Sequence, residues 1–294
     1  MAPALFPGFR DERFRVEGHE VAAWVGGSGP PLLLLHGYPQ TRALWHKVAP
    51  RLARRFTVVA ADLRGYGDSG KPESGPGHAG YSKRAMAADP AALMQALGHP
   101  RYFLAGHDRG GRVAHRLAMD YSERVLRVAV LDIAPTLAMY EQTTEAFARA
   151  YWHWFFLILP KPQPERMLGA DPIGYLRFKI SQGRAGLAPF APEALAEYER
   201  CFTPESIHTM CEDYRAAATI DLVHDRADRD AGRKLSMPLL ALWGAHGVVE
   251  HCFKPLDEWR RVADDVRGSA LPAGHYLPEE VPDLVADEFE SFFK

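Results

Sequence analysis

The stretch that most constrains the fold is Leu104-Ala105-Gly106-His107-Asp108-Arg109-Gly110-Gly111-Arg112. Apolar residues before Gly106 predict the end of a buried strand, and the residues from Gly110 onward predict the start of a helix. A Gly-x-Asp-x-Gly sequence at such a junction has the form of a nucleophile elbow, with aspartate at the reactive position. Glycine on both sides lets the backbone pass close to a strained central residue. The alternative is an ordinary strand-to-helix turn with a solvated Asp108.

Apolar segments alternate with helical patterns on both sides of this turn. Continuous apolar runs, typical of strands buried on both faces, occupy residues 31–37, 56–61, 102–106, 125–131 and 238–243. Shorter strands are predicted at 14–18, 20–25 and 266–271. Helices are predicted at 41–54 with Thr41 as N-cap, at 82–97 with a kink or break at Pro90, and at 110–120, 255–262 and 279–293. This alternation predicts an α/β fold, a mostly parallel sheet covered by helices on both faces.

The strand pattern stops between residues 135 and 235, where the chain is helical, aromatic and interrupted by prolines. We therefore expect a core domain of residues 1–134 and 236–294, and a helical cap domain of residues 135–235 inserted after the sixth strand. Ligands of such sheets bind beyond the carboxyl ends of the strands. Asp108, Asp132, His36 and the loop after the last strand all belong to that edge, and an insertion after Asp132 would roof it.

Composition excludes several classes of partner. The chain has 294 residues, 47% hydrophobic and 24% charged, with a formal net charge of −2, so nothing indicates a nucleic-acid footprint. Its three cysteines have no CxxC spacing, and an odd number argues against a disulfide framework. No apolar run is long enough to span a membrane, and the first nine residues do not resemble a signal peptide. We expect a cytoplasmic protein with no nucleic-acid or membrane partner.

An aspartyl ester formed at Asp108 needs a base that activates water. His275 follows the last predicted strand, and the order nucleophile, acid, histidine is that of the α/β-hydrolase triad. The orienting acid is expected after the strand at 125–131, which is followed by Asp132, or after the strand at 238–243. The second strand has no carboxylate at the usual place, and Glu250 is a distant second choice. We choose Asp132. The backbone N–H groups of Arg109 and Tyr38 are the expected oxyanion donors.

Two arginines follow the nucleophile closely. Arg109 is the next residue, and Arg112 lies in the first turn of the predicted helix. Two guanidinium groups beside an anionic aspartate predict a clamp for a substrate carboxylate, because the guanidinium fork matches a carboxylate in a bidentate way. The alternative is that Arg112 lies on the surface and that Arg109 is a structural ion-pair partner.

The predicted cap contains the aromatic segment Tyr151-Trp152-His153-Trp154-Phe155-Phe156. Such a segment can simply be the core of the cap. However, the N–H groups of His153 and Trp154 are donors without a carboxylate, which suits a small departing anion, and the Tyr214 hydroxyl could add a third donor.

Together these motifs resemble the fluoroacetate dehalogenase family of the α/β-hydrolase superfamily, over nearly the whole chain. The resemblance rests on His36-Gly37-Tyr38-Pro39, Asp62-Leu63-Arg64-Gly65-Tyr66-Gly67-Asp68-Ser69, Gly106-His107-Asp108-Arg109-Gly110-Gly111-Arg112, Asp132-Ile133-Ala134-Pro135-Thr136, Trp152-His153-Trp154-Phe155 and Gly274-His275. The Asp-Arg-x-x-Arg elbow combined with His-Trp in the cap is its most specific part. Family members more often have phenylalanine at the position of Tyr38.

The resemblance implies a cofactor-free enzyme without a metal that hydrolyses fluoroacetate and other haloacetates, and a homodimer. It implies that Asp108 is the nucleophile, His275 the base and Asp132 its partner. Arg109 and Arg112 would hold the substrate carboxylate near Tyr38, and His153, Trp154 and Tyr214 would hold the halide. The alternatives are an epoxide hydrolase, which would need two cap tyrosines and leave the arginines idle, and a non-catalytic receptor for small acids on the same scaffold.

Overall fold

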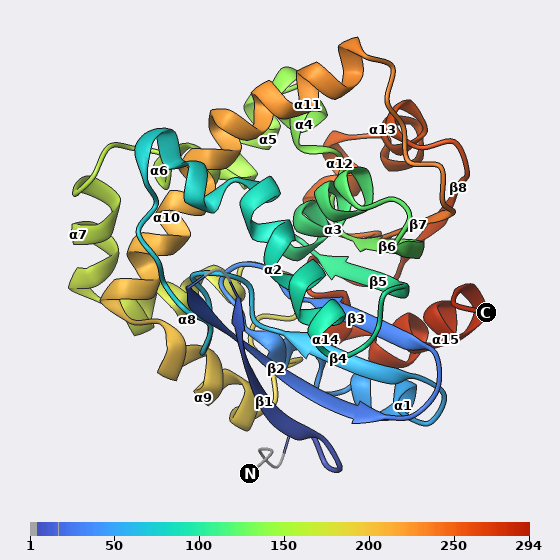
Figure 1. Cartoon of the computed structure of the whole chain (residues 1–294). Coiled ribbons are helices and arrows are strands. Elements are labelled where there is room, and N and C mark those ends of the chain that lie inside the picture. The colour runs from blue at the N-terminus through green and yellow to red at the C-terminus, as the bar shows by residue number, and fades with distance from the viewer. Residues whose placement is uncertain (1–4, 17) are drawn as a thin grey trace.

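The computed structural model describes residues 5–16 and 18–294. Within these residues one sheet of eight strands has the order β1-β2-β4-β3-β5-β6-β7-β8 (Figure 1). The strands are β1 (Arg10–Val16), β2 (His19–Gly27), β3 (Pro31–Leu35), β4 (Thr57–Ala61), β5 (Tyr102–His107), β6 (Val125–Leu131), β7 (Leu239–Gly244) and β8 (Val266–Leu271). Strand β2 is antiparallel to β1 and β4, and the remaining neighbours are parallel. In the strand register, Leu35 of β3 lies beside Gly106 of β5, which lies beside Val130 of β6. This register brings the carboxyl ends of the three strands to one edge of the sheet.

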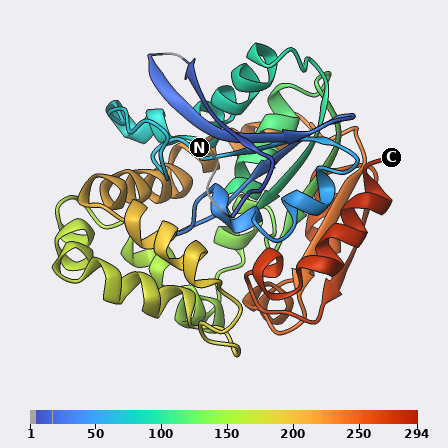
Figure 2. The ribbon, with the colours of Figure 1, turned by 90° about the horizontal axis from the view of Figure 1, so that it is seen from below.

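Helices cover both faces of this sheet. Figure 2 shows α2 and α3 on one face and α1 and α15 on the other. The helices of this part are η1 (Arg42–Trp45), α1 (Ala49–Leu52), η2 (Pro76–Tyr81), α2 (Lys83–Ala96), α3 (Arg109–Asp120), α12 (Val248–Cys252), α13 (Pro255–Val262), α14 (Leu277–Glu280) and α15 (Pro282–Phe292). Strand β5 is buried along its whole length, as expected for a strand covered on both faces. The predicted fold class is confirmed.

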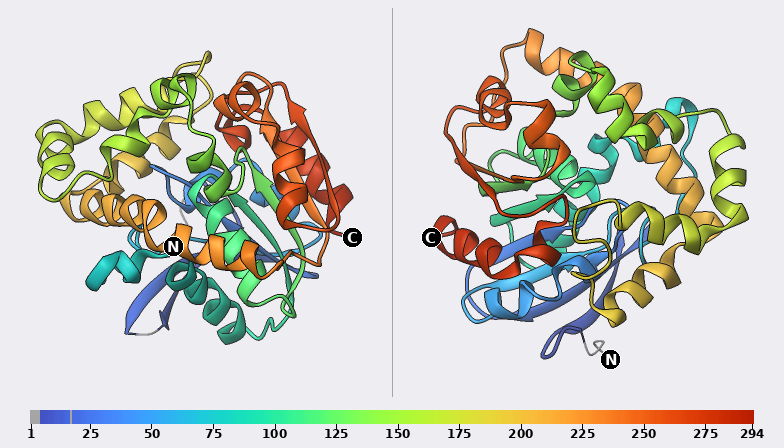
Figure 3. Two further views of the ribbon diagram at one scale, coloured as in Figure 1. Left: turned by 90° about the horizontal axis from the view of Figure 1, so that it is seen from above. Right: turned by 180° about the vertical axis from the view of Figure 1, so that it is seen from behind.

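Between β6 and β7 all the longer regular elements are helices, and we call this segment the helical insertion. Its helices are α4 (Thr136–Glu141), α5 (Glu145–Ala150), α6 (Trp152–Phe156), α7 (Gln163–Ala170), α8 (Pro172–Ile180), α9 (Pro192–Cys201), α10 (Pro204–Ala218) and α11 (Ile220–Asp230). Figure 3 shows these green to orange helices gathered beside the sheet. The division into a core domain and a cap domain stays a prediction.

Prolines explain most differences from the predicted elements. The single helix predicted at 41–54 is two short helices, because Pro50 lacks the N–H that a continuous helix needs at that position. The last helix is likewise divided, and α15 begins at Pro282. In contrast, α2 continues through Pro90 as one helix. Thr41 caps η1 as predicted, by accepting a hydrogen bond from the Ala43 N–H.

The first two strands are longer than predicted, and Glu17, within the segment predicted at 14–18, lies outside the described residues. Of the segment predicted to lack a signal peptide, residues 1–4 also lie outside them. Among the described helices, none has the length and apolar character needed to cross a membrane.

Candidate active site

Asp108 occupies a strained turn between β5 and α3. Its backbone has φ 47° and ψ −114°, a conformation that costs a non-glycine residue about 1–3 kcal/mol. The turn also needs glycine on both sides. A Cβ on Gly106 would lie 2.3 Å from the Gly110 carbonyl oxygen, and one on Gly110 would lie 2.2 Å from the His36 carbonyl oxygen. The strain and the two close approaches are the features expected of a nucleophile elbow.

The two carboxylate oxygens of Asp108 have different neighbours. Oδ1 accepts a hydrogen bond of 3.0 Å from the backbone N–H of Tyr38, and Oδ2 lies 3.9 Å from Nε2 of His275. Burial would raise the pKa of Asp108, but His275 and the nearby arginines outweigh burial and hold this pKa below its ordinary value. Asp108 is therefore a buried anion with one oxygen held and the other directed toward His275.

His275 is oriented by Asp132. The distance from His275 Nδ1 to Asp132 Oδ2 is 2.5 Å, and Asp132 Oδ1 accepts a 2.9 Å hydrogen bond from the Gly244 N–H. The other candidate, Glu250, accepts a hydrogen bond from the Trp243 indole instead. A proton on Nδ1, held by Asp132, leaves Nε2 as the basic nitrogen on the side of Asp108. The structure thus brings Asp108, His275 and Asp132 together in the expected order of contact.

Arg109 is buried and ion-paired with Asp213 of α10. Its Nε donates to Asp213 Oδ2 at 2.9 Å, and its Nη2 donates to Oδ1 at 2.6 Å. Its Nη1 has no hydrogen-bond partner within the described residues. Burial opposes the charged form of Arg109, but Asp213 outweighs it and holds the Arg109 pKa well above its ordinary value. The Nε and Nη2 groups of Arg109 are therefore occupied by Asp213 and cannot hold a substrate carboxylate in the bidentate way that we expected. Nη1 remains available to a ligand.

Asp213 belongs to a larger buried charge cluster. It also accepts a 2.7 Å hydrogen bond from the Tyr66 hydroxyl and a hydrogen bond from Lys83, which contacts Asp221 as well. Burial would raise the pKa of Asp213, but Arg109 and Lys83 shift it well below its ordinary value. Asp213 was not among the predicted site residues, and the only signal for it in the sequence was its position directly before Tyr214.

Arg112 is also buried, and its contacts lie on the helical insertion and the segment that leads into it. Nη1 donates to the Ala134 carbonyl at 3.2 Å and to Thr136 Oγ1 at 2.9 Å. Among the residues that the structure describes, none accepts a hydrogen bond from its Nε. The guanidinium carbon lies 4.6 Å from the centre of the Trp154 ring. Arg112 therefore connects α3, the helix that follows Asp108, to Trp154 of the helical insertion.

The three expected halide ligands come together around the arginines. The centre of the Tyr214 ring lies 5.9 Å from that of His153, 6.4 Å from that of Trp154 and 4.2 Å from the Arg109 guanidinium carbon. Trp154 Nε1, Tyr214 Oη and His153 Nδ1 are buried and have no hydrogen-bond partner in the described part of the chain. Burial lowers the pKa of His153 well below its ordinary value and raises that of Tyr214, so both side chains are neutral.

Tyr38 completes one wall of this site. Its ring is nearly parallel to that of His153, with centres 6.0 Å apart, and its hydroxyl forms a 2.8 Å hydrogen bond with that of Tyr175 on α8. A cavity of about 290 Å³ is lined by His275, Tyr151 and Lys179 among others. The Tyr151 hydroxyl lies 3.4 Å from His275 Nδ1. Tyr151, Tyr175 and Lys179 are further site residues that the sequence analysis did not single out.

The arrangement combines the buried carboxylate of Asp108, the histidine that Asp132 orients, and several donors without a hydrogen-bond partner in the described residues. Two cationic donors are Arg109 Nη1 and Arg112 Nε, and the neutral donors belong to Trp154 and Tyr214. Such a set fits a small anionic molecule that loses a second anion. No group of three or more potential metal ligands occurs within residues 5–16 and 18–294.

Comparison with known proteins identifies the family of this chain. The family model of the α/β hydrolase fold matches residues 30–272. The fluoroacetate dehalogenase of Burkholderia sp is 45% identical over 98% of this chain and 95% of its own length, and the soluble epoxide hydrolase of Corynebacterium sp is 35% identical over 95% of each. The chain belongs to the α/β hydrolase fold family.

Two solved structures are similar to this chain over almost its whole length. A protein from Pseudomonas aeruginosa described as an epoxide hydrolase, solved as a variant with bound MFA, is 43% identical, with a TM-score of 0.93 over 98% of this chain and 96% of that one. An α/β hydrolase from Nostoc sp is 51% identical, with a TM-score of 0.95 over 97% and 98% of the two chains. Within the α/β hydrolases, the chain is a member of the haloacetate dehalogenase family, which confirms the predicted family and enzyme class.

Proposed function

We propose that the protein hydrolyses the carbon–halogen bond of fluoroacetate and other haloacetates, giving glycolate and halide. The observation that carries this proposal is the set of buried, unpaired N–H and O–H donors around an anionic Asp108. A haloacetate supplies one anion for Arg109 and Arg112 and releases a second anion for Trp154 and Tyr214. The name of the Burkholderia relative at 45% identity supports the same substrate class.

In the first step, Asp108 Oδ2 attacks the α-carbon and the halide leaves with the electron pair of the carbon–halogen bond. The substrate carboxylate receives single hydrogen bonds from Arg109 Nη1 and Arg112 Nε, because the fork of Arg109 is held by Asp213. Trp154 and Tyr214 donate to the departing halide. Their help matters most for fluoride, since hydrogen bonds that strengthen as charge develops lower the barrier.

In the second step, His275 Nε2 removes a proton from water, and the resulting hydroxide attacks Cγ of the Asp108 ester. Negative charge develops on Oδ1, which already accepts the Tyr38 N–H at 3.0 Å. An oxyanion donor of this kind contributes about 3 kcal/mol. Collapse of the intermediate breaks the bond between Cγ and the glycolate oxygen, which takes the proton from His275. Asp108 is left as the acid, and loss of this proton to solvent regenerates the carboxylate.

An epoxide hydrolase is the second candidate, and two observations favour it. Tyr151 and Tyr214 both place buried hydroxyls in the site, and the Corynebacterium relative is named an epoxide hydrolase. The unpaired nitrogens of Arg109 and Arg112 would have no role with a neutral epoxide, so we favour the haloacid.

Turnover measurements separate the candidates. We expect repeated release of fluoride and glycolate from fluoroacetate, measured with a fluoride electrode and by chromatography, and no diol from styrene oxide. Diol formation without fluoride release would replace the proposal by an epoxide hydrolase. Binding of fluoroacetate without turnover of either compound would indicate a receptor for small acids. The homodimer implied by the family resemblance is part of the same proposal.

A further inference from the structure

The cavity of about 290 Å³ that His275 lines, which we call the His275 cavity, also reaches the surface of the protein. Three of its other lining residues, Arg149, Gln182 and His246, are exposed. The His275 side chain itself is 20% exposed, and its Nε2 lies 3.9 Å from Asp108 Oδ2. The cavity therefore connects solvent with His275, which is in turn the neighbour of Asp108.

The lining of the His275 cavity has an excess of positive charge. Its charged residues are Arg149 and Lys179, its histidines are His246 and His275, and no aspartate or glutamate occurs among the described residues that line it. Arg149 is paired with Glu145 at 2.7 Å, and both side chains are 79% exposed, so Glu145 and water screen its charge. Lys179 thus supplies the uncompensated charge of this cavity.

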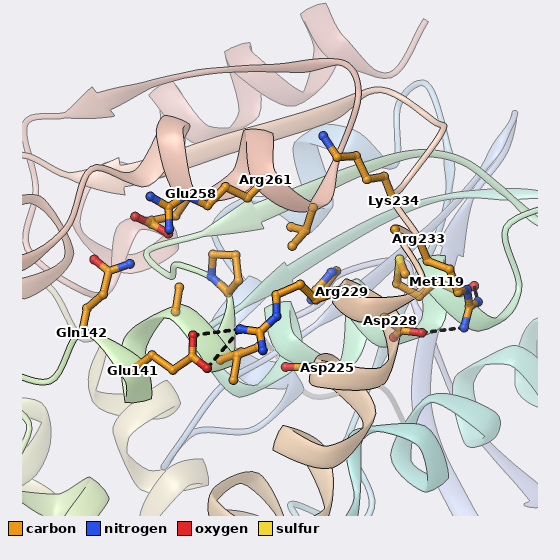
Figure 4. A pocket seen from close by; sticks show the side chains of 16 residues that line it. Met119, Glu141, Gln142, Asp225, Asp228, Arg229, Arg233, Lys234, Glu258 and Arg261 are labelled. Atoms are coloured by element: carbon orange, nitrogen blue, oxygen red, sulfur yellow. Dashed lines mark hydrogen bonds and ion pairs between the residues drawn. The ribbon is translucent and has the colours of Figure 1, made fainter.

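Another cavity, of about 230 Å³, lies between α3 and α13 of the sheet region and α4 and α11 of the helical insertion (Figure 4). Four acidic and four basic residues line it. Figure 4 shows Arg229 paired with Glu141, at 3.1 Å to both carboxylate oxygens, and Arg233 paired with Asp228 at 2.6 Å. The charges of this second cavity therefore balance one another, and it offers no excess charge to an anion.

Lys179 of α8 is buried without an anionic partner. It is 8% exposed, and its Nζ donates to the amide oxygen of Gln182 at 3.4 Å. Within the described part of the chain, no aspartate or glutamate forms an ion pair with it. Lys83, which is also buried, contacts the carboxylates of Asp213 and Asp221. Buried lysines are normally paired, because an isolated charge loses its hydration. An anion in the cavity would supply the partner that Lys179 lacks.

The ammonium group of Lys179 acts electrostatically on the proposed reacting residues. Burial lowers the pKa of Lys179 to about 8, and the Asp108 carboxylate opposes this shift. The charge of Lys179 also contributes, after burial, to the lowered pKa of His153. Lys179 is therefore mainly protonated at pH 7, and its charge acts on both the proposed nucleophile and a proposed halide ligand.

We propose that Lys179 binds the carboxylate of an incoming haloacid in the His275 cavity, before this carboxylate passes to the arginine clamp of Arg109 and Arg112. The inference rests on the proposed function, which identifies the anion as a haloacid. Lysine suits a temporary contact, because its ammonium is a single charge on a flexible stem, whereas Asp213 holds Arg109 in a fixed position. A positive charge on the route into the site also raises the rate at which an anion arrives.

NMR of the lysine side chains tests the binding without turnover. In protein labelled at lysine Cε and Nζ, acetate, a carboxylate without a leaving group, should shift the signal of Lys179 in a saturable way, and Lys179→Arg identifies this signal. The signal of Lys161, which is exposed, should not move. Acetamide, which is neutral, and sodium chloride at the same ionic strength should leave Lys179 unchanged. An equal shift with sodium chloride, or no shift with acetate, would overturn the proposal.

Arg112→Lys separates the Lys179 site from the arginine clamp. This change weakens the clamp and leaves the His275 cavity intact, because Arg112 does not line that cavity. The acetate concentration that half-saturates the Lys179 signal should therefore change by less than twofold. A change as large as the loss of binding at the clamp would show that Lys179 only responds to acetate bound there, and would overturn the proposal.

Stopped-flow fluorescence measures how fast acetate reaches the clamp. The Trp154 ring lies 4.6 Å from the Arg112 guanidinium carbon, so its fluorescence should report binding at the clamp. Lys179→Met keeps the length of the side chain without its charge and should lower the association rate constant at least fivefold. Lys179→Arg, which keeps the charge, should change it by less than twofold.

The matched control is Lys161→Met, which also removes one positive charge from the helical insertion, at an exposed position outside the His275 cavity. It should change the association rate constant by less than twofold. Equal effects of Lys179→Met and Lys161→Met would mean that only net charge matters and would overturn the proposal.

Thermal unfolding checks for a structural role of Lys179. Because Lys179 is buried without an anionic partner, Lys179→Met should not lower the Tm. A lower Tm, together with an association rate constant that Lys179→Arg does not restore, would assign the slower association to altered packing and overturn the proposal.

The inference and the proposed function can fail separately. Fluoride release by a protein whose Lys179 does not respond to acetate would overturn the inference and leave the proposed function standing. A saturable Lys179 shift in a protein that never turns over fluoroacetate would contradict the proposed function and leave a carboxylate site at Lys179.

Discussion

Replacing Asp213 with asparagine should destabilise the protein by about 3 kcal/mol at neutral pH. The Asp213 carboxylate is fully buried and accepts hydrogen bonds from Arg109 at 2.6 and 2.9 Å, from Tyr66 at 2.7 Å and from Lys83. Removing one partner of a buried ion pair typically costs about 3–5 kcal/mol, because the remaining charge stays buried without compensation. Asparagine preserves the shape and one acceptor oxygen, so we expect the lower end of this range.

The effect should depend on pH with a definite sign. The folded-state pKa of Asp213 is lowered, so its contribution to stability is complete above the pKa of an unfolded aspartate, about 3.9. As the pH falls below about 4, the wild type loses this contribution, whereas Asp213→Asn has no carboxyl group to protonate. The difference in the free energy of unfolding between the two proteins should therefore be constant above about pH 5 and should shrink in more acidic solution.

Urea unfolding followed by tryptophan fluorescence measures this difference. A matched control is Asp257→Asn, because Asp257 pairs with Arg260 at 3.2 Å on the surface, where its side chain is 59% exposed. Exposed pairs of this kind contribute less than about 1 kcal/mol. If Asp213→Asn were no more destabilising than Asp257→Asn, the buried cluster would not be what holds Arg109 in place.

Two substitutions test the substrate contacts. Arg112→Lys should lower kcat/KM for fluoroacetate by about 10- to 150-fold, because a charge-assisted hydrogen bond is worth about 1.5–3 kcal/mol. The single ammonium group of lysine cannot contact Thr136, Ala134 and a substrate together. A wild-type kcat/KM would refute the clamp. Trp154→Phe keeps the ring but removes the indole donor, so fluoroacetate turnover should fall more than bromoacetate turnover, and equal losses would assign Trp154 to packing alone.

Much of the fold is predictable from local patterns. The apolar runs at 102–106 and 125–131 form strands because each has the length and apolar character of a strand buried on both faces. The first run ends at Gly106, and the polar residue Asp132 follows the second. The breaks at Pro50 and Pro282 were harder to place, since proline is tolerated in the first turn of a helix and the pattern alone does not say where that turn is. Helix α2 continues through Pro90 and packs against α3, and the local pattern around Pro90 gave no sign of either.

The candidate site, too, could be predicted only where local sequence patterns determine which residues meet. Asp108, Asp132 and His275 follow strands, and parallel strands carry such residues to one edge, so their proximity could be expected. The pairing of Arg109 with Asp213 joins residues 104 positions apart. Nothing in the spacing of Arg109 showed that its fork was occupied, because that depends on how α10 packs against the elbow.

The covalent ester on Asp108 is the central claim, and intact-protein mass spectrometry of His275→Ala tests it most directly. This variant keeps the nucleophile, the arginines and the halide donors but lacks the base for ester hydrolysis. After incubation with fluoroacetate it should release one equivalent of fluoride and gain one carboxymethyl group, which peptide mapping should locate on Asp108. Asp108→Asn should release no fluoride. A carboxymethyl group on any other residue, or sustained turnover by Asp108→Asn without deamidation, would contradict the aspartyl-ester mechanism.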